Sequence, residues 1–114
     1  MSSTIEIPTL KFAEEHIQPI LRGQKTATLR LDMDLIQIGQ RVHLVDEDGV
    51  RFATVVVSDR GYESIEWLQR AGVDGHRDYD SVEEMIEAMQ RYYPDADIGP
   101  QTCLDVVYWE ELWE

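Results

Sequence analysis

The stretch that decides the fold reads Ile-Leu-Arg-Gly-Gln-Lys-Thr-Ala-Thr-Leu-Arg, at residues 20–30. Apolar side chains recur at helical spacing within residues 13–22, and Gly23 stands where a helix C-cap belongs. Since Pro19 lacks an amide proton, we expect the regular part of this helix to begin shortly before it. Residues 25–31 then alternate between polar and apolar side chains, as a half-buried β-strand does. The segment predicts a helix, a glycine stop and a strand.

The alternation gives the predicted strand a polar face and a core face. Thr26, Thr28 and Arg30 share the polar face. The core face carries Ala27, Leu29 and Leu31. Strict alternation would put Lys25 and Thr28 on opposite faces. Any joint role of Lys25 and Thr28 therefore requires Lys25 to lie in the turn before the strand begins.

The middle of the chain predicts a β-hairpin. A short extended segment at residues 9–12 precedes the first helix, and β-rich runs occupy residues 41–45 and 50–58. The acidic segment at residues 46–49 ends in Asp-Gly, a strong hairpin signal between two such runs. Gly61 is expected to open a turn after the hairpin.

Two helices, a loop and a closing strand complete the predicted order. They are expected at residues 62–71 (helix), 72–80 (loop), 82–92 (helix) and 102–108 (strand). Ser81 and Glu84 form a capping box at the start of the second helix. The order contains no repeated βαβ unit, which favours an α+β fold around a largely antiparallel or mixed sheet that curls into a small barrel.

Composition limits the class of protein. The 114 residues are 43% hydrophobic and 29% charged, which fits one globular domain over residues 1–114. The single cysteine, Cys103, excludes an internal disulfide framework. No stretch approaches the roughly 20 apolar residues of a membrane span, and residues 1–10 lack the basic and apolar parts of a signal peptide. We expect a cytoplasmic protein that does not bind membranes.

The formal net charge of -13 is unevenly distributed. Residues 1–60 hold 9 acidic and 7 basic side chains, whereas residues 61–114 hold 14 and 3. Because phosphates repel an acidic surface, a nucleotide or nucleic-acid site should lie on the first half, and no DNA partner is expected. Eight Arg against two Lys, with the acidic surplus, resembles the surface chemistry of proteins from salt-loving organisms, where salt screens such repulsion.

Residues 20–30 resemble the signature of the ASCH domain, a relative of the PUA domain of RNA-binding and RNA-modifying proteins. A Gly-x-x-Val entry at residues 39–42, the Tyr-Tyr-Pro helix end at residues 92–94 and an apolar last strand follow in the family's order. The resemblance extends over about residues 10–110. It implies a PUA-like β-barrel of five or six strands with flanking helices, and a cleft lined by the Gly-x-Lys-Thr segment at residues 23–26.

The resemblance also implies an activity. Some bacterial ASCH proteins are amidohydrolases that remove the acetyl group of N4-acetylcytidine with a Lys, a Thr three residues later and a Glu before the late helix. The first two correspond to Lys25 and Thr28, and the third falls on Asp78, a shorter carboxylate. Gly23, Thr26 and Arg30 would bind the substrate, a modified pyrimidine nucleoside or RNA, with no metal or organic cofactor. The alternative is a non-catalytic RNA-binding module that uses the same cleft.

Each candidate residue has a chemical role and a structural alternative. A desolvated Lys25 can take the proton of the Thr28 hydroxyl, and Arg30 can hold a carbonyl or a phosphate. Asp78 would orient Lys25 or protonate the leaving amine. As alternatives, Lys25 offsets a helix end, Asp78 supports the next helix, and Arg30 pairs with a carboxylate at position 32 or 34.

Other residues carry weaker signals. The histidines do not have the spacing of a metal site, and a zinc site that combined them with Cys103 is disfavoured against solvated or core positions for His16, His43 and His76. Of the aromatic side chains, Trp109 and Trp113 near the acidic end are expected to be exposed. A third function, protein interaction through this terminal segment, follows from that expectation.

Overall fold

The computed structural model describes residues 7–31, 33 and 36–113. The elements follow the predicted order of strand, helix, strand, hairpin, two helices and strand. They are β1 (Thr9–Lys11), α1 (Glu14–Leu21), β2 (Ala27–Arg30), β3 (Arg41–Val45), β4 (Arg51–Ser64), α2 (Ile65–Ala71), α3 (Val82–Tyr92) and β5 (Cys103–Trp113). Among the described residues, no helix combines the length and the apolar character needed to cross a membrane.

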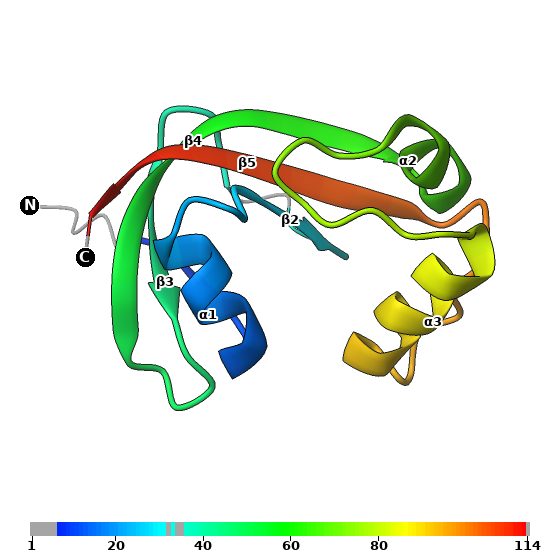
Figure 1. Ribbon diagram of the computed structural model, residues 1–114, viewed down its shortest axis with the longest axis horizontal. Coiled ribbons are helices and arrows are strands. Elements are labelled where there is room, and N and C mark those ends of the chain that lie inside the picture. The colour runs from blue at the N-terminus through cyan, green and yellow to red at the C-terminus, as the bar shows by residue number, and fades with distance from the viewer. Residues whose placement is uncertain (1–6, 32, 34–35, 114) are drawn as a thin grey trace, which may run out of the picture.

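The strands form one mixed sheet in the order β1-β3-β4-β5-β2. The pair β1–β3 is parallel and the other pairs are antiparallel. The long strands β4 and β5 bend along their length, so that the sheet curls into a half-barrel (Figure 1). This confirms the α+β class and the curled, mixed sheet expected from the sequence.

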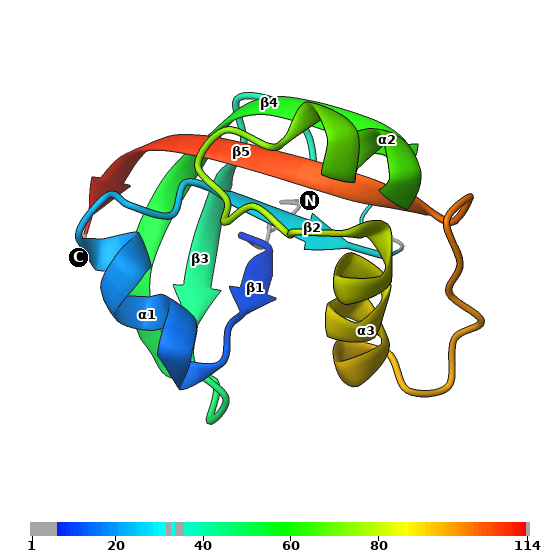
Figure 2. The same ribbon diagram turned by 45° about the vertical axis from the view of Figure 1, so that its right-hand side comes forward.

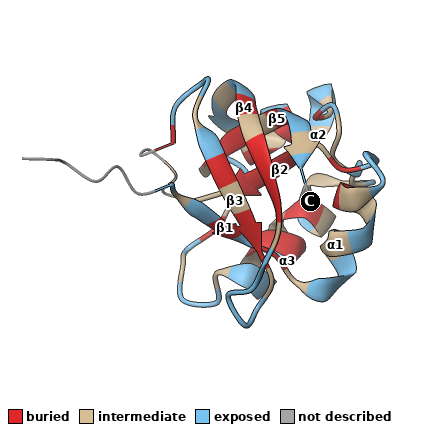
Figure 3. Ribbon diagram, turned by 90° about the vertical axis from the view of Figure 1, so that its left-hand side faces the viewer, coloured by how far each residue is buried: buried red, intermediate tan, exposed pale blue. Residues whose placement is uncertain are grey.

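Strand β5 separates two hydrophobic cores because its side chains alternate between its faces. Val107 and Trp109 belong to the core between α1 and the strands β1, β3 and β4. Leu104 and Val106 belong to the core that α2 and α3 cover. In Figure 3 the buried positions concentrate along the strands, with exposed positions mainly on helices and loops.

The predicted boundaries of several elements are confirmed. The backbone amide of Glu84 donates to the Ser81 hydroxyl over 3.1 Å at the start of α3, and the hairpin turn closes with Asp46 N to Val50 O at 2.9 Å. Helix α1 differs from the expectation, because Pro19 lies in its last turn and the helix already begins at Glu14.

The predicted turn at Gly61 is wrong. Gly61 lies inside β4 and pairs with Val106 of β5, so the strand continues to Ser64 and α2 begins only at Ile65. The side chain of Ser64 caps α2 by accepting a hydrogen bond from Trp67 N. Pairing with β5 overrides the local turn preference of glycine in this strand.

The closing strand is longer than predicted, and Trp109 is not exposed. The side chain of Trp109 is only 4% exposed and packs edge-on against Phe12, with 6.0 Å between ring centroids. Trp113 is 46% exposed, as expected. Pairing of β5 with β4 extends to Trp113, which places Trp109 on the core face of the sheet.

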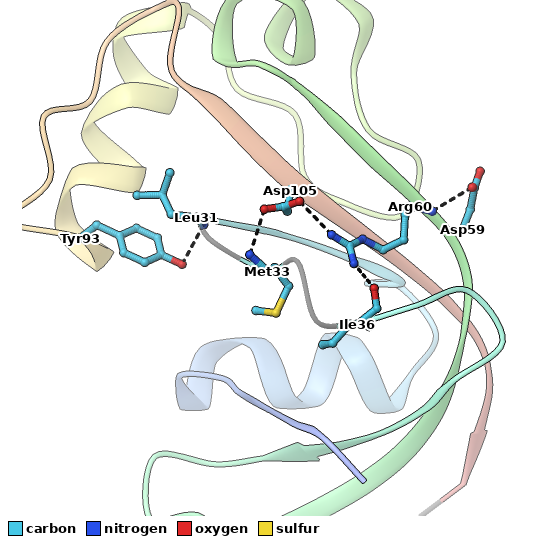
Figure 4. Close-up of polar contacts among 7 residues, drawn as sticks. All are labelled: Leu31, Met33, Ile36, Asp59, Arg60, Tyr93 and Asp105. Carbon is cyan, nitrogen blue, oxygen red and sulfur yellow. Dashed lines mark hydrogen bonds and ion pairs between the residues drawn. The ribbon is translucent and has the colours of Figure 1, made fainter. Parts of the chain in front are cut away.

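A largely buried ion pair between Arg60 and Asp105 lies inside the half-barrel (Figure 4). Arg60 of β4 donates to Asp105 of β5 over 2.8 Å and also to the backbone oxygen of Ile36. The second oxygen of Asp105 accepts from the amide of Met33 at 2.9 Å, while the amide of Leu31 donates to the Tyr93 hydroxyl. These contacts attach the chain that leaves β2 to the middle of the sheet and to α3.

Candidate functional site

The turn after α1 places Lys25 ahead of the strand, as its predicted role requires. Gly23 has a φ of +75°, and its amide donates to Ile20 O while that of Gln24 donates to Pro19 O. This is the Schellman pattern of helix ends, which glycine favours. The amide of Lys25 donates to Pro19 O as well, at 3.1 Å, and β2 begins only at Ala27. Lys25 is therefore held by the helix end rather than by strand alternation.

Thr28 and Arg30 share one face of β2, as predicted. Thr28 is 4% exposed, and its hydroxyl oxygen accepts a hydrogen bond from Arg30 Nε over 3.1 Å. The guanidinium of Arg30 also donates to Lys11 O at 2.6 Å and lies over the Phe12 ring, 4.7 Å from its centroid. Since β1 and β2 are the two edges of the sheet, Arg30 connects the edges across the curl. The carboxylates of Asp32 and Asp34, its alternative partners, lie outside the described residues.

Thr26 fixes the loop at residues 72–80 against the start of β2. Its amide donates to Gly75 O at 2.8 Å, and its own carbonyl accepts from Trp109 N at 3.0 Å. Gly75 has a φ of +79°, and a Cβ on it would lie 1.8 Å from the Thr26 hydroxyl oxygen. Figures 1 and 2 show this loop passing along β2, with α1 and α3 on either side.

The loop brings further side chains into the electrostatic environment of Lys25. We call Lys25, Arg30, Arg77, His16 and His76 the Lys25 cluster. Lys25 is 9% exposed, and burial lowers the pKa of its ammonium from 10.5 to about 8, with the charges of Arg30 and Arg77 as further causes. A lysine with such a pKa is partly neutral at neutral pH and can act as a base.

The two histidines of the Lys25 cluster both have lowered pKa values. Burial lowers the pKa of His76 to about 4, with the Lys25 charge as the next cause, and burial and Lys25 lower the pKa of His16 too. His16 Nε2 lies 2.8 Å from the Tyr92 hydroxyl, which joins α1 to α3. His43, in contrast, contacts Thr54 on β4 and lies outside the cluster.

Asp78 is not brought into contact with Lys25. It is exposed, and within the described part of the chain it forms no ion pair with Lys25. One Asp78 oxygen lies 3.4 Å from where a Cβ on Gly72 would be, and the residue lines a small pocket with Met85 of α3. Its assigned part in catalysis stays a prediction.

The sequence did not single out His16, His76, Arg77 or Tyr92 as site residues. They come from α1, the loop at residues 72–80 and α3, and no spacing along the chain relates them. The described residues contain no group of three or more His, Cys, Asp or Glu side chains arranged to hold a metal ion.

Solved structures show which fold this is. An ASCH protein from Zymomonas mobilis superposes with a TM-score of 0.63 at 11% identity, over 90% of this chain and 66% of that one. The ASCH domain from Lactobacillus crispatus JV V101 gives 0.57 at 17% identity, over 82% and 67%. The chain has the ASCH-domain fold.

A third structure extends this ASCH-fold likeness. Protein EF3133 from Enterococcus faecalis V583, of family DUF984, gives a TM-score of 0.70 at 17% identity, over 94% of this chain and 81% of that one. No protein-family model matches the sequence, and no curated protein matches it. The chain spans about two thirds of the length of the Zymomonas protein. The expected PUA-like ASCH fold is thus confirmed by structure.

Proposed function

We propose that this ASCH-fold chain binds an N4-acylated cytidine at the Lys25 cluster and hydrolyses its amide. The observation that carries the proposal is a buried lysine whose pKa is lowered to about 8, in part by the charge of Arg30, which itself donates to a buried threonine hydroxyl. Arg30 donates to Thr28 Oγ1, and its positive charge contributes to the lowered pKa of Lys25, so the three residues share one electrostatic environment. A lone buried lysine offers only a base, whereas this arrangement offers a base and a nucleophile.

The chemistry proceeds through an acyl-threonine. Neutral Lys25 takes the hydroxyl proton of Thr28 while Oγ1 attacks the acyl carbon, and the guanidinium of Arg30 stabilises the negative charge that develops on the acyl carbonyl oxygen. When the C–N bond breaks, the Lys25 ammonium returns the proton to the leaving N4 amine. Water then attacks the ester, its proton passes through Lys25 to Thr28 Oγ1, and the products are cytidine and a carboxylate.

The side chains of Lys25 and Thr28 must come within hydrogen-bond distance of each other when substrate binds. The described residues include no hydrogen bond between these side chains. Catalytic hydrogen bonds are often long in the absence of substrate and shorten in its complex. Lys25 carries both proton transfers in this scheme, and Asp78 joins it only if the loop at residues 72–80 moves.

Turnover of N4-acetylcytidine tests the proposal. Release of cytidine is followed by chromatography for the parent, for Lys25→Ala and for Lys11→Ala, whose lysine is exposed on β1. The parent and the Lys11 variant should turn over equally and the Lys25 variant should be inactive. Equal rates in all three would refute the role of Lys25.

RNA binding without catalysis is the second candidate. Its support is the gathering of Lys25, Arg30 and Arg77 in a chain of net charge -13, because such a local excess of cations fits a phosphate ligand. A binding module would retain single-stranded RNA with a steep salt dependence, would lose affinity in Arg30→Ala and Arg77→Ala, and would release no cytidine.

A further inference from the structure

A second concave surface lies where β4 and β5 meet α2, apart from the Lys25 cluster. It is a groove of about 440 Å³, and it shares no lining residue with that cluster. Its lining comes from three places: Ser58–Glu63 of β4, Val106 and Tyr108 of β5, and Trp67, Leu68 and Asp74 of α2 and the following loop. Neither the fold nor the proposed hydrolysis requires a groove here.

Gly61 leaves the floor of the groove open. It is the only glycine in β4, its φ lies outside the left-handed region, and a Cβ there would make ordinary contact with Val106 at 3.5 Å. The backbone therefore does not need glycine at this position, although glycine weakens a strand interior by roughly 0.5–1 kcal/mol relative to alanine. A glycine in a strand marks a bulge, a bend or a place where another group approaches closely; the nearer register shift of β4 lies between Val57 and Asp59, before Gly61, and the groove lies directly over this glycine.

Carboxylates line the rim of the groove. Asp59 and Glu63 share the face of Gly61 because side chains alternate along β4, and Asp74 faces them from the loop after α2. In the described part of the chain none of the three pairs with a cation. The one basic residue of the lining, Arg60, turns its guanidinium away to Asp105 and Ile36 (Figure 4). The groove is therefore negative.

Aromatic side chains supply its apolar surface. Trp67, in the first turn of α2, is 51% exposed although it is a large aromatic residue. Tyr108 lies opposite Asp59 across β4 and β5, and burial together with the charges of Asp74 and Asp59 raises the pKa of its phenol. The carboxylates and the aromatic side chains thus line the same groove and would contact the same ligand.

From these observations we propose that the groove binds an arginine or lysine side chain of a basic peptide segment from a partner protein. The cation would meet the aromatic face of Trp67 and the carboxylates of Glu63 and Asp74, and its alkyl stem would lie over Gly61. A nucleic acid, an anionic membrane or a second copy of this chain would bring negative charge to a negative groove.

Nuclear magnetic resonance titration of the folded chain tests this assignment. The probe is acetyl-Gly-Arg-Gly-Arg-Gly-amide, and the reporter is the indole N–H of Trp67, assigned with Trp67→Phe. The peptide should shift this resonance, whereas the same peptide with neutral citrulline in place of arginine should not. Equal binding of the two peptides, or no shift with the arginine peptide, would overturn the proposal.

Matched variants locate the binding site. The double variant Glu63→Gln with Asp74→Asn should lower the affinity for the arginine peptide by about tenfold or more. The double variant Glu83→Gln with Glu87→Gln makes the same charge change on the exposed face of α3 and should leave the affinity unchanged. Gly61→Val should abolish binding by filling the floor. An equal loss of affinity in both double variants would mean that the net charge of the chain controls binding, and it would overturn the proposed site.

Two further measurements address other occupants. If spermidine shifts the Trp67 resonance and the peptide does not, the groove binds a free polyamine and not a peptide side chain. A dimer, detected by sedimentation, that covers Trp67 and excludes the peptide would make the groove a self-interface. Either result would overturn the partner proposed here.

Discussion

Gly75 and Thr26 approach so closely that a Cβ on Gly75 would lie 1.8 Å from the Thr26 hydroxyl oxygen. With the hydrogen bond from Thr26 N to Gly75 O, this contact fixes the loop at residues 72–80 beside β2. The same loop carries His76 and Arg77, which belong to the Lys25 cluster. Local packing at one glycine thus controls the surroundings of Lys25.

We expect Gly75→Ala to lower the free energy of unfolding by about 2–4 kcal/mol, because the methyl group clashes with Thr26 and the φ of +79° disfavours a side chain. Gly49→Ala is the matched control, since its φ of +83° is similar but nothing lies within 4 Å of its Cβ. It should cost only about 1 kcal/mol. Denaturant unfolding of both variants measures the difference, and equal losses would show that the close approach does not matter.

The activity should depend on pH through Lys25. Because burial lowers its pKa to about 8, the neutral amine becomes the main form only above that pH. The rate of amide hydrolysis should therefore rise between about pH 6 and pH 8 and level off above. A rate that stays constant over this range, with the fold intact, would exclude Lys25 as the base.

The buried ammonium should also cost stability. The pKa of Lys25 is about 8 in the folded chain and near 10.5 when unfolded, so the unfolded state holds the proton more tightly between these values. The free energy of unfolding should rise with pH through this window. Accordingly, Lys25→Met should stabilise the chain at pH 7 by up to about 3 kcal/mol, whereas Lys11→Met, on an exposed strand position, should be neutral. Thermal unfolding measures the midpoints of both variants, and a Lys25→Met midpoint no higher than that of the parent would show that the buried ammonium does not lower stability.

Loss of Asp105 should be among the most destabilising polar changes. Asp105→Asn leaves the largely buried guanidinium of Arg60 without its counter-charge, which should cost about 2–4 kcal/mol, somewhat less than for a fully buried pair. The double variant Arg60→Met with Asp105→Leu should recover part of this loss, because no isolated charge then stays buried. If the single variant is as stable as the parent, the pair is not a structural element of the barrel.

The elements that the sequence predicted have local causes. The end of α1 follows from the conformational freedom of Gly23, and the start of α3 from the Ser81 hydroxyl. The end of β4 was missed because Gly61 reads as a turn until β5 pairs with it, and that pairing joins residues about 45 positions apart.

The candidate site was predicted only in part, because some of its residues meet through contacts between distant parts of the sequence. Lys25, Thr28 and Arg30 stand within one short segment, so their relation was visible in the sequence. His76 and Arg77 reach the Lys25 cluster only through the contact of Gly75 with Thr26, and the exposed position of Asp78 depends on the path of the same loop. Trp109 was misplaced because the length of β5 is set by its pairing with β4.

The most direct test of Thr28 as the nucleophile is cytidine release from N4-acetylcytidine by the parent, Thr28→Ser and Thr28→Val. Serine keeps the hydroxyl that Arg30 contacts, whereas valine keeps the shape of threonine without a nucleophile. If Thr28 is the nucleophile, the parent and the serine variant release cytidine and the folded valine variant does not. Hydrolysis by the valine variant at the parent's rate would contradict this role.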